Sequence, residues 1–144
     1  MLASPAMALP QTPLLAVDCV AIDRKGRVLL IRRGREPFKG CYALPGGFVA
    51  IGETVEDGCR RELFEETGVK AGRLRLIGVY SDPRRDPRGH TVSVAFLARA
   101  RTVAAAAGTD AAAVEWVTRW KRLELAFDHL QILSDAVRLA QRRR

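Results

Sequence analysis

Runs of apolar residues, some continuous and some alternating with polar ones, predict a series of short strands along this chain. The predicted strands span residues 14–22, 27–33, 42–49, 74–80, 91–100 and 113–117. The polar segment 23–26 contains a glycine and predicts a turn that joins the first two strands in a hairpin. Pro45, Gly46 and Gly47 interrupt the third strand, and the alanine-rich run 104–108 predicts a loop.

Two further segments have the features of helices. Residues 54–67 start at Thr54, a suitable N-cap with Asp57 three positions later, as in a capping box. Gly68 is placed to end this helix in the left-handed conformation. Residues 128–141 carry apolar side chains at helical spacing, namely Leu130, Leu133, Val137 and Ala140. Strands of mixed order with two helices predict an α/β (α+β) sandwich.

Length and composition fit one domain with its own core. The chain has 144 residues, 48% of them hydrophobic, and shows no internal repeat or dividing linker. We expect one domain at 14–141, between a flexible proline-rich tail at 1–13 and a basic tail at 142–144. The first tail lacks a basic start, and no segment approaches the roughly 20 apolar residues of a membrane span. Neither a signal peptide nor a membrane association is therefore expected.

The charge balance is basic, with 24 Lys and Arg against 16 Asp and Glu and a net charge of +8. Half of this excess comes from the four arginines in 138–144, a terminal segment of the kind that solvent usually surrounds. The moderately basic remainder suits a polyanionic substrate such as a diphosphate. Nucleic acid is a possible partner that this charge does not require, and we do not expect it.

The three cysteines, Cys19, Cys41 and Cys59, have neither metal-ligand spacing nor the even count of a disulfide framework. Cys19 lies in an aliphatic run and Cys59 lies one helical turn before Leu63, so both are predicted to be buried. The sequence leaves the environment of Cys41 open. Unpaired cysteines favour a reducing cytoplasm as the location of the protein.

Three glutamates, Glu62, Glu65 and Glu66, share one face of the first predicted helix. Carboxylates at this spacing repel one another, so a cation is needed to compensate them. Clustered carboxylate oxygens match Mg²⁺, or Mn²⁺ as a substitute, better than Zn²⁺. A solvated acidic surface is the alternative interpretation. Leu63 and Phe64 are predicted to point away from this face and to anchor the helix on the sheet.

The residues around the glutamates favour a metal site. Gly46 and Gly47 permit close approach of the backbone to a ligand, and Glu53 and Arg61 add charged partners. The segment resembles the Nudix box, the pattern G-x5-E-x7-R-E-U-x-E-E-x-G-U in which U is aliphatic. All nine specified positions match, at Gly47, Glu53, Arg61, Glu62, Leu63, Glu65, Glu66, Gly68 and Val69.

This resemblance implies an α/β/α sandwich with a mixed central sheet that hydrolyses a nucleoside diphosphate linked to another moiety. By position in the box, Glu62 and Glu66 would be the main metal ligands. Glu65 would share in metal binding or activate water, and the Gly46 carbonyl would complete the coordination. Arg61 would orient the glutamates while paired with Glu53.

Members of the family also use a carboxylate outside the box as a base or an additional ligand. Asp110 is the candidate, because it lies in a predicted loop six residues before Trp116. The alternative role for Asp110 is to cap a turn. Asp82, Asp86 and Asp128 are rival candidates.

The arginine- and proline-rich segment 81–90 is the second informative region. Arg84, Arg85 and Arg88 can make bidentate contacts with phosphate, although a solvated hairpin turn has a similar composition. With Pro83, this segment resembles the ADP-ribose pyrophosphatase branch of the family, which implies cleavage of ADP-ribose to AMP and ribose 5-phosphate.

Other substrate contacts are predicted from position along the strands. Arg32 is a candidate substrate ligand, although Arg32 and Arg33 alternate and at most one of them faces the site. Trp116 and Trp120 could stack on adenine or pack in the core. His90 is expected to form structural hydrogen bonds.

Two alternative functions remain open at this point. One is hydrolysis of (d)NTPs, dinucleotides or RNA 5′ ends. The other is non-catalytic sensing of ADP-ribose, because the segment 125–129 also resembles the Nudix domain of transcriptional regulators that continue into a winged helix. The intact glutamates favour an enzyme. A homodimer is expected from the resemblance alone.

Overall fold

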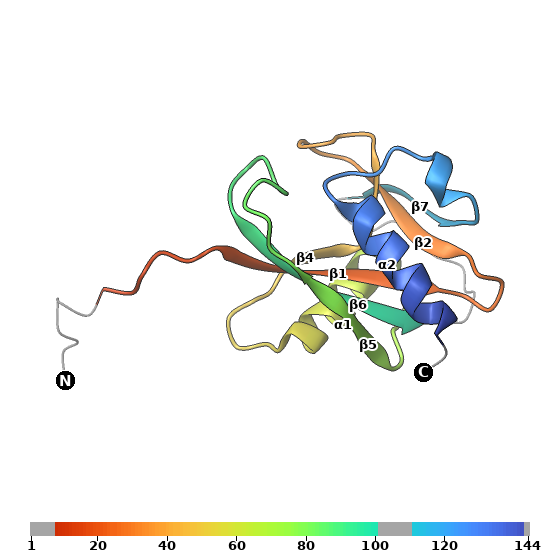
Figure 1. The fold of residues 1–144 in the computed structure, drawn as a ribbon, viewed down its shortest axis with the longest axis horizontal. Coiled ribbons are helices and arrows are strands. Elements are labelled where there is room, and N and C mark those ends of the chain that lie inside the picture. Colours follow the sequence, from red (N-terminus) through yellow and green to blue (C-terminus); the bar gives the residue numbers. More distant parts are fainter. Residues whose placement is uncertain (1–7, 101–110, 143–144) are drawn as a thin grey trace.

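The computed structural model describes residues 8–100 and 111–142 and consists of a mixed sheet between two helices (Figure 1). The strands are β1 (Leu14–Ile22), β2 (Val28–Arg33), β3 (Tyr42–Ala43), β4 (Gly46–Phe48), β5 (Leu74–Tyr80), β6 (Thr91–Arg99) and β7 (Ala111–Val117). The helices are α1 (Val55–Thr67), α2 (His129–Gln141) and the short 3-10 helix η1 (Trp120–Arg122). This arrangement confirms the predicted α/β/α sandwich.

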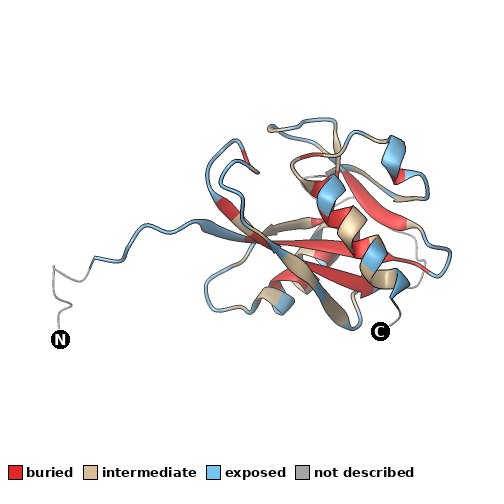
Figure 2. Ribbon diagram, in the orientation of Figure 1, coloured by how far each residue is buried: buried red, intermediate tan, exposed pale blue. Residues whose placement is uncertain are grey.

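Strand β1 is the centre of the sheet. It pairs in parallel with β6 from Leu14 to Ile22, and its other edge pairs antiparallel with β4 and, at Ile22, with β2. Val20 packs on the α2 side and Cys19 on the α1 side, so that both faces of β1 are covered. Burial on both faces accounts for its continuous aliphatic sequence. Figure 2 shows this burial along β1, β2 and β6.

The ends of α1 follow the predicted signals. The Thr54 hydroxyl accepts a hydrogen bond from the Asp57 amide at 3.0 Å, and Gly68 ends the helix with a φ of 75°. Leu63 is fully buried, as predicted. The prediction for Phe64 is wrong, because its side chain is 50% exposed. Successive helix residues point about 100° apart, so the face that buries Leu63 against the sheet does not include Phe64.

Several boundaries differ from those predicted. The third strand divides into β3 and β4, β7 begins two residues early, and η1 was not predicted. The predicted loop 104–108 and Asp110 lie outside the described residues. Residues 8–13 are exposed and form neither helix nor strand. Within 8–100 and 111–142, no helix is long and apolar enough to span a bilayer.

The three cysteines are unpaired. Cys19 and Cys59 are buried together in the core between β1 and α1, as predicted, and Cys41 is partly buried. The neighbouring Cys59 thiol and burial both raise the pKa of Cys19 well above its ordinary value. These two thiols therefore act as small apolar side chains.

Candidate active site

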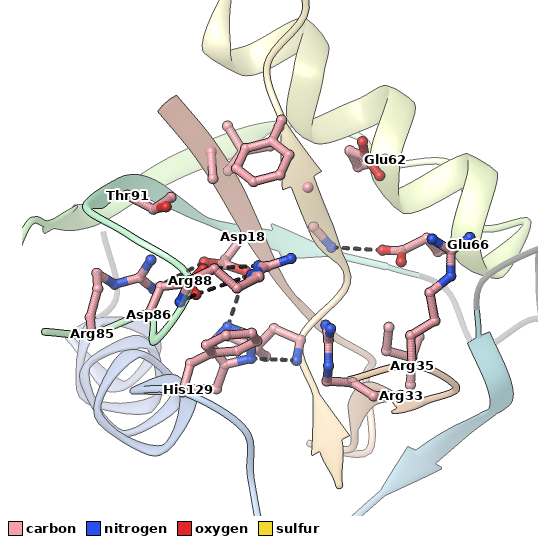
Figure 3. A pocket seen from close by; sticks show the side chains of 18 of the residues that line it. Asp18, Arg33, Arg35, Glu62, Glu66, Arg85, Asp86, Arg88, Thr91 and His129 are labelled. Carbon is pink, nitrogen blue, oxygen red and sulfur yellow. Dashed lines mark hydrogen bonds and ion pairs between the residues drawn. The ribbon is translucent and has the colours of Figure 1, made fainter. Parts of the chain in front are cut away.

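A cavity of about 380 Å³ opens at the end of the sheet where β4, the first half of β1 and the start of α2 meet (Figure 3). Glu62 and Glu66 of α1 line one side of it. Arg33 at the end of β2, Arg35 just after it and Arg88 in segment 81–90 also line the cavity. The cavity therefore offers carboxylates and guanidinium groups to the same ligand.

Helix α1 presents its glutamates to different surroundings. Glu66 accepts a hydrogen bond from the Gly46 amide at 2.8 Å, which fixes one carboxylate oxygen beside β4. Burial raises the pKa of Glu62, although the Arg61 guanidinium opposes this shift. Glu65 does not line the cavity, and its side chain is 56% exposed. The first and last glutamates of the trio are thus the ones placed to hold a cation.

The Arg61 guanidinium connects the glutamates of α1 to the preceding loop. It contacts Glu53 at 2.7 and 3.0 Å, Glu62 at 3.1 Å, Glu65 at 3.0 Å and the Phe48 carbonyl at 3.1 Å. Its hydrogen bonds and the Ala50 amide lower the pKa of Glu53 to about 2. Arg61 and Glu53 are therefore ionised together and hold the loop against the helix.

Two glycines bring the backbone of β4 against its neighbours. A Cβ atom at Gly47 would lie 2.5 Å from a Glu62 carboxylate oxygen, and one at Gly46 would lie 2.2 Å from the Val17 carbonyl oxygen. Neither position has room for a larger residue. Gly47 is thus a spatial requirement for placing Glu62 beside β4, and Gly46 is one for packing β4 against β1.

The donor set fits a hard cation that also binds substrate. Within the described ranges, no group of three or more His, Cys, Asp or Glu side chains converges to hold a metal ion. Glu65 contacts Arg61 at 3.0 Å and does not line the cavity. Mg²⁺ commonly takes only one or two carboxylates and completes its coordination with water and substrate phosphates. Glu62 and Glu66 fit that pattern, and the role of the Gly46 carbonyl stays a prediction.

A buried polar network forms part of the cavity wall and was not predicted. Asp18 accepts a hydrogen bond from the Ser93 hydroxyl at 2.5 Å, and its other oxygen lies 3.3 Å from His129 Nε2. The Leu44 amide donates to His129 Nδ1 at 3.0 Å, so the proton-bearing Nε2 is the nitrogen that faces Asp18. A buried aspartate in an aliphatic strand requires such partners, and this was the available sequence signal.

Arg85 joins this network to the segment 81–90. Its guanidinium contacts both carboxylate oxygens of Asp128, at 2.6 and 2.8 Å, and lies 3.7 Å from Asp18. Burial opposes ionisation of Asp18, but His129, Ser93 and Arg85 together lower its pKa. Arg85 therefore anchors the segment to the start of α2. Its contact with substrate stays a prediction.

The predicted substrate arginines occupy different environments. Arg85 and Arg88 line the cavity, and Arg88 is paired with Asp86 at 2.9 Å. Arg84 is exposed beside Asp82 and does not line it. Arg32 lies outside the cavity over the Tyr42 ring.

Two arginines that were not chosen as ligands do line the cavity. Arg33 takes the place predicted for Arg32, because alternate residues of a strand face opposite sides. Arg35 extends toward Glu66 (Figure 3). Its signal was its place between the predicted strands 27–33 and 42–49, just after the first of them. Together, Arg33 and Arg35 supply positive charge on the side away from segment 81–90.

Neither tryptophan lines the cavity. Trp120 is buried in the core beneath α2, and Trp116 packs against the core beneath α1. The aromatic residues of the cavity wall are instead Phe48 and Phe127. His90 Nε2 donates a hydrogen bond to the Ser81 carbonyl oxygen at 3.0 Å, in keeping with a structural role.

Carboxylates and arginines on one cavity of an α/β/α sandwich define a protein that acts on a phosphorylated ligand. Residues 12–136 match the family model of the NUDIX domain. The ADP-ribose pyrophosphatase of Methanocaldococcus jannaschii is 47% identical over 126 residues, which cover 88% of this chain and 74% of that protein. The chain therefore belongs to the Nudix family and is a pyrophosphohydrolase.

Further similarities include regulators. The ADPR responsive transcriptional repressor NtrR of Acinetobacter baylyi is 34% identical over 133 residues, which cover 87% of this chain and 53% of the repressor. Among solved structures, the NUDIX domain of Shewanella oneidensis NrtR complexed with ADP ribose has a TM-score of 0.85 at 29% identity, covering 96% of this chain and 94% of that one. A MutT/nudix family protein from Enterococcus faecalis has a TM-score of 0.84 at 33% identity, covering 96% and 70%.

Proposed function

We propose that this protein hydrolyses ADP-ribose to AMP and ribose 5-phosphate in the presence of Mg²⁺, with Mn²⁺ as a substitute. The observation that carries the proposal is the cavity, whose wall contains Glu62 and Glu66 together with a group of arginines. A diphosphate needs both a cation held by carboxylates and direct guanidinium contacts. The M. jannaschii ADP-ribose pyrophosphatase supports the choice of substrate.

In the proposed reaction a water molecule attacks one phosphorus of the diphosphate in line, and the bridging oxygen leaves with the other phosphate. A bound divalent ion would supply charge neutralisation and a more acidic water. Glu62 and Glu66 would hold this ion, while Arg33, Arg35 and Arg88 bind the phosphate oxygens. We propose Glu65 or Asp110 as the group that accepts the proton from water.

We further propose a homodimer in a reducing cytoplasm. The unpaired cysteines support the location. The edge strand β5 supports self-association, because its Leu76 and Val79 side chains are 55% and 59% exposed. Apolar side chains on an unpaired sheet edge favour contact with another chain.

A substrate panel with Mg²⁺ tests the proposed activity. The panel contains ADP-ribose, NADH, dinucleoside polyphosphates, dNTPs and 5′-triphosphate RNA, with AMP and phosphate release as readouts. We expect AMP from ADP-ribose and slower turnover of the others. Faster turnover of dNTPs or RNA would transfer the proposal to that substrate. Tight ADP-ribose binding without turnover of any compound would instead identify a sensor, as the repressor similarity suggests.

A further inference from the structure

Segment 44–46 leads from β3 into β4 and helps to fix the carboxylate of Glu66. The Gly46 amide donates to Glu66 Oε1 at 2.8 Å, so the position of this carboxylate depends in part on the position of Gly46. Pro45 has no amide hydrogen to donate, and Gly46 has no side chain to pack. The segment therefore needs an anchor from another part of the molecule.

The first residue of α2, His129, supplies such an anchor (Figure 3). The Leu44 amide donates to His129 Nδ1 at 3.0 Å, and both residues are buried. The residues of β3 that pair with β2 are Tyr42 and Ala43, so this ladder does not include Leu44. A buried amide is unfavourable without an acceptor, so the bond to the imidazole holds the segment in place.

Asp18 sets the orientation of this imidazole. Its Oδ1 atom lies 3.3 Å from His129 Nε2, and the Ser93 hydroxyl donates to its Oδ2 atom at 2.5 Å. The proton on Nε2 faces the carboxylate, which leaves Nδ1 as the acceptor for Leu44. Asp18 also pairs with Gly46 in the ladder between β1 and β4, and a Cβ atom at Gly46 would lie 2.7 Å from Asp18 Oδ1. The contact between His129 and Asp18 thus lies beside Gly46.

We propose that His129 is a positioning residue for the candidate metal site. By accepting the Leu44 amide, it holds segment 44–46 where Gly46 fixes the Glu66 carboxylate at the cavity. Partners that orient a ligand without touching the metal raise metal affinity, because the ligand is already in place. This inference rests on the proposed function for the use of the metal, but the anchoring of Gly46 is measurable without metal or substrate.

Two amide substitutions separate the contacts of His129. In His129→Asn the side-chain oxygen takes the place of Nδ1 and can still accept the Leu44 amide, but the side chain is too short for Asp18. In His129→Gln the side-chain nitrogen takes the place of Nε2 and can still donate to Asp18, but no acceptor faces Leu44. Tyr80→Phe is the control, because it removes the 2.7 Å bond between Tyr80 and Asp135 of α2, neither of which lines the cavity.

Three measurements compare these variants of the full chain. Amide hydrogen exchange by NMR reports how firmly Leu44 and Gly46 are held, with no metal added. The electron paramagnetic resonance signal of free Mn²⁺ reports metal binding without substrate. Hydrolysis of ADP-ribose against Mg²⁺ concentration separates an effect on metal use from an effect on the KM for substrate.

We expect His129→Gln to speed the exchange of the Leu44 and Gly46 amides and to weaken Mn²⁺ binding on the order of 10-fold. The Mg²⁺ concentration for half-maximal turnover should rise by a similar factor, while the KM for ADP-ribose at saturating Mg²⁺ stays near that of the wild type. His129→Asn should stay near the wild type in all three measurements. Tyr80→Phe should lower the melting temperature and leave Mn²⁺ binding and the exchange of both amides unchanged.

Three results would overturn the role of His129: wild-type exchange of Gly46 in His129→Gln, an equal loss in His129→Asn, or the same loss of Mn²⁺ binding in Tyr80→Phe. If His129→Gln does not fold, native-state exchange of the wild type decides. The Leu44 and Gly46 amides should then open together, and a Gly46 amide that opens while Leu44 stays closed would contradict the anchor. The expected exchange in a protein that hydrolyses no substrate would refute the proposed function and leave the anchoring of Gly46 by His129 intact.

Discussion

Arg61 shows how single side chains control this site. Its guanidinium contacts three carboxylates, those of Glu53, Glu62 and Glu65. Because Arg61 shares its charge among these carboxylates, it neutralises Glu62 only in part. Glu62 also lines the cavity. Glu66 accepts a hydrogen bond from the Gly46 amide, and it also lines the cavity. The last glutamate of the trio therefore offers the sharpest test of metal binding.

Glu66→Gln should lower turnover on the order of 100-fold or more, because an uncharged amide binds Mg²⁺ poorly. The fold should remain, since the amide oxygen of glutamine can still accept the Gly46 hydrogen bond. Activity against Mg²⁺ concentration and thermal melting together measure both effects. Glu56→Gln, an exposed change in the first turn of the same helix, is the matched control. Wild-type activity in Glu66→Gln would refute its role as a ligand.

Gly47→Ala should displace Glu62, because the added Cβ would lie 2.5 Å from its carboxylate. A displacement of this size at a reacting centre lowers kcat/KM on the order of 100-fold. Gly72→Ala provides the control, since a Cβ there meets no atom within 4 Å. Steady-state kinetics of the two variants measure the difference, and equal activities would show that Glu62 tolerates the methyl group.

The lowered pKa of Asp18 predicts acid sensitivity. Its folded-state pKa lies below the ordinary value of 3.8, so the unfolded chain binds its proton first as the pH falls. The stabilisation is therefore present above about pH 4 and is lost as the pH falls through the folded-state value. His129, Ser93 and Arg85 face this carboxylate. Asp18→Asn should show a flatter loss of stability between pH 5 and pH 2 in urea unfolding; parallel curves would contradict this assignment.

At the scale of elements, two arginines of segment 81–90, Arg84 and Arg85, form ion pairs with different consequences. Arg84 pairs with Asp82 inside the segment, where both side chains are exposed. Arg85 is 5% exposed and reaches across to the start of α2. An internal surface pair contributes little to stability, whereas a buried pair between elements fixes their relative position. The segment is therefore attached through Arg85.

Arg85→Met should reduce the free energy of unfolding by about 3 kcal/mol, because it leaves Asp128 and buried Asp18 without their cation. Arg84→Met should change it by less than about 0.5 kcal/mol. Denaturant unfolding of both variants measures the contrast. Equal free energies of unfolding for Arg85→Met and Arg84→Met would show that Arg85 does not anchor the segment. The predicted contact with substrate would then be the remaining role of Arg85.

Local signals explain which elements could be predicted. Thr54 and Gly68 mark the ends of α1 because capping depends on neighbouring residues. The contact of Asp18 with His129 joins positions 111 residues apart, and no short-range pattern encodes it. Arg32 was chosen over Arg33 because alternation along a strand does not say which face meets a cavity. The glutamates of α1 could be identified because their spacing on one helix is itself local.

At the scale of the whole molecule, β5 ends the order of strands in the sheet. If two copies associate through this edge, Val79→Lys should convert a dimer to a monomer, because it adds charge beside Leu76. Sedimentation velocity measures the change. Leu130→Lys, an exposed apolar position on α2, is the control and should keep the dimer. A monomeric wild-type protein, or a dimer that survives Val79→Lys, would contradict association through β5.

The position of Arg61 also affects how the protein would respond to a low Mg²⁺ concentration. Its guanidinium offsets the repulsion between Glu62 and Glu65 through its contacts with both carboxylates. A helix that carries its own counter-charge keeps its shape when magnesium is scarce. Under the proposed Mg²⁺ dependence, removal of Mg²⁺ would stop hydrolysis without unfolding the protein. Addition of Mg²⁺ would then restore hydrolysis by the same protein molecules.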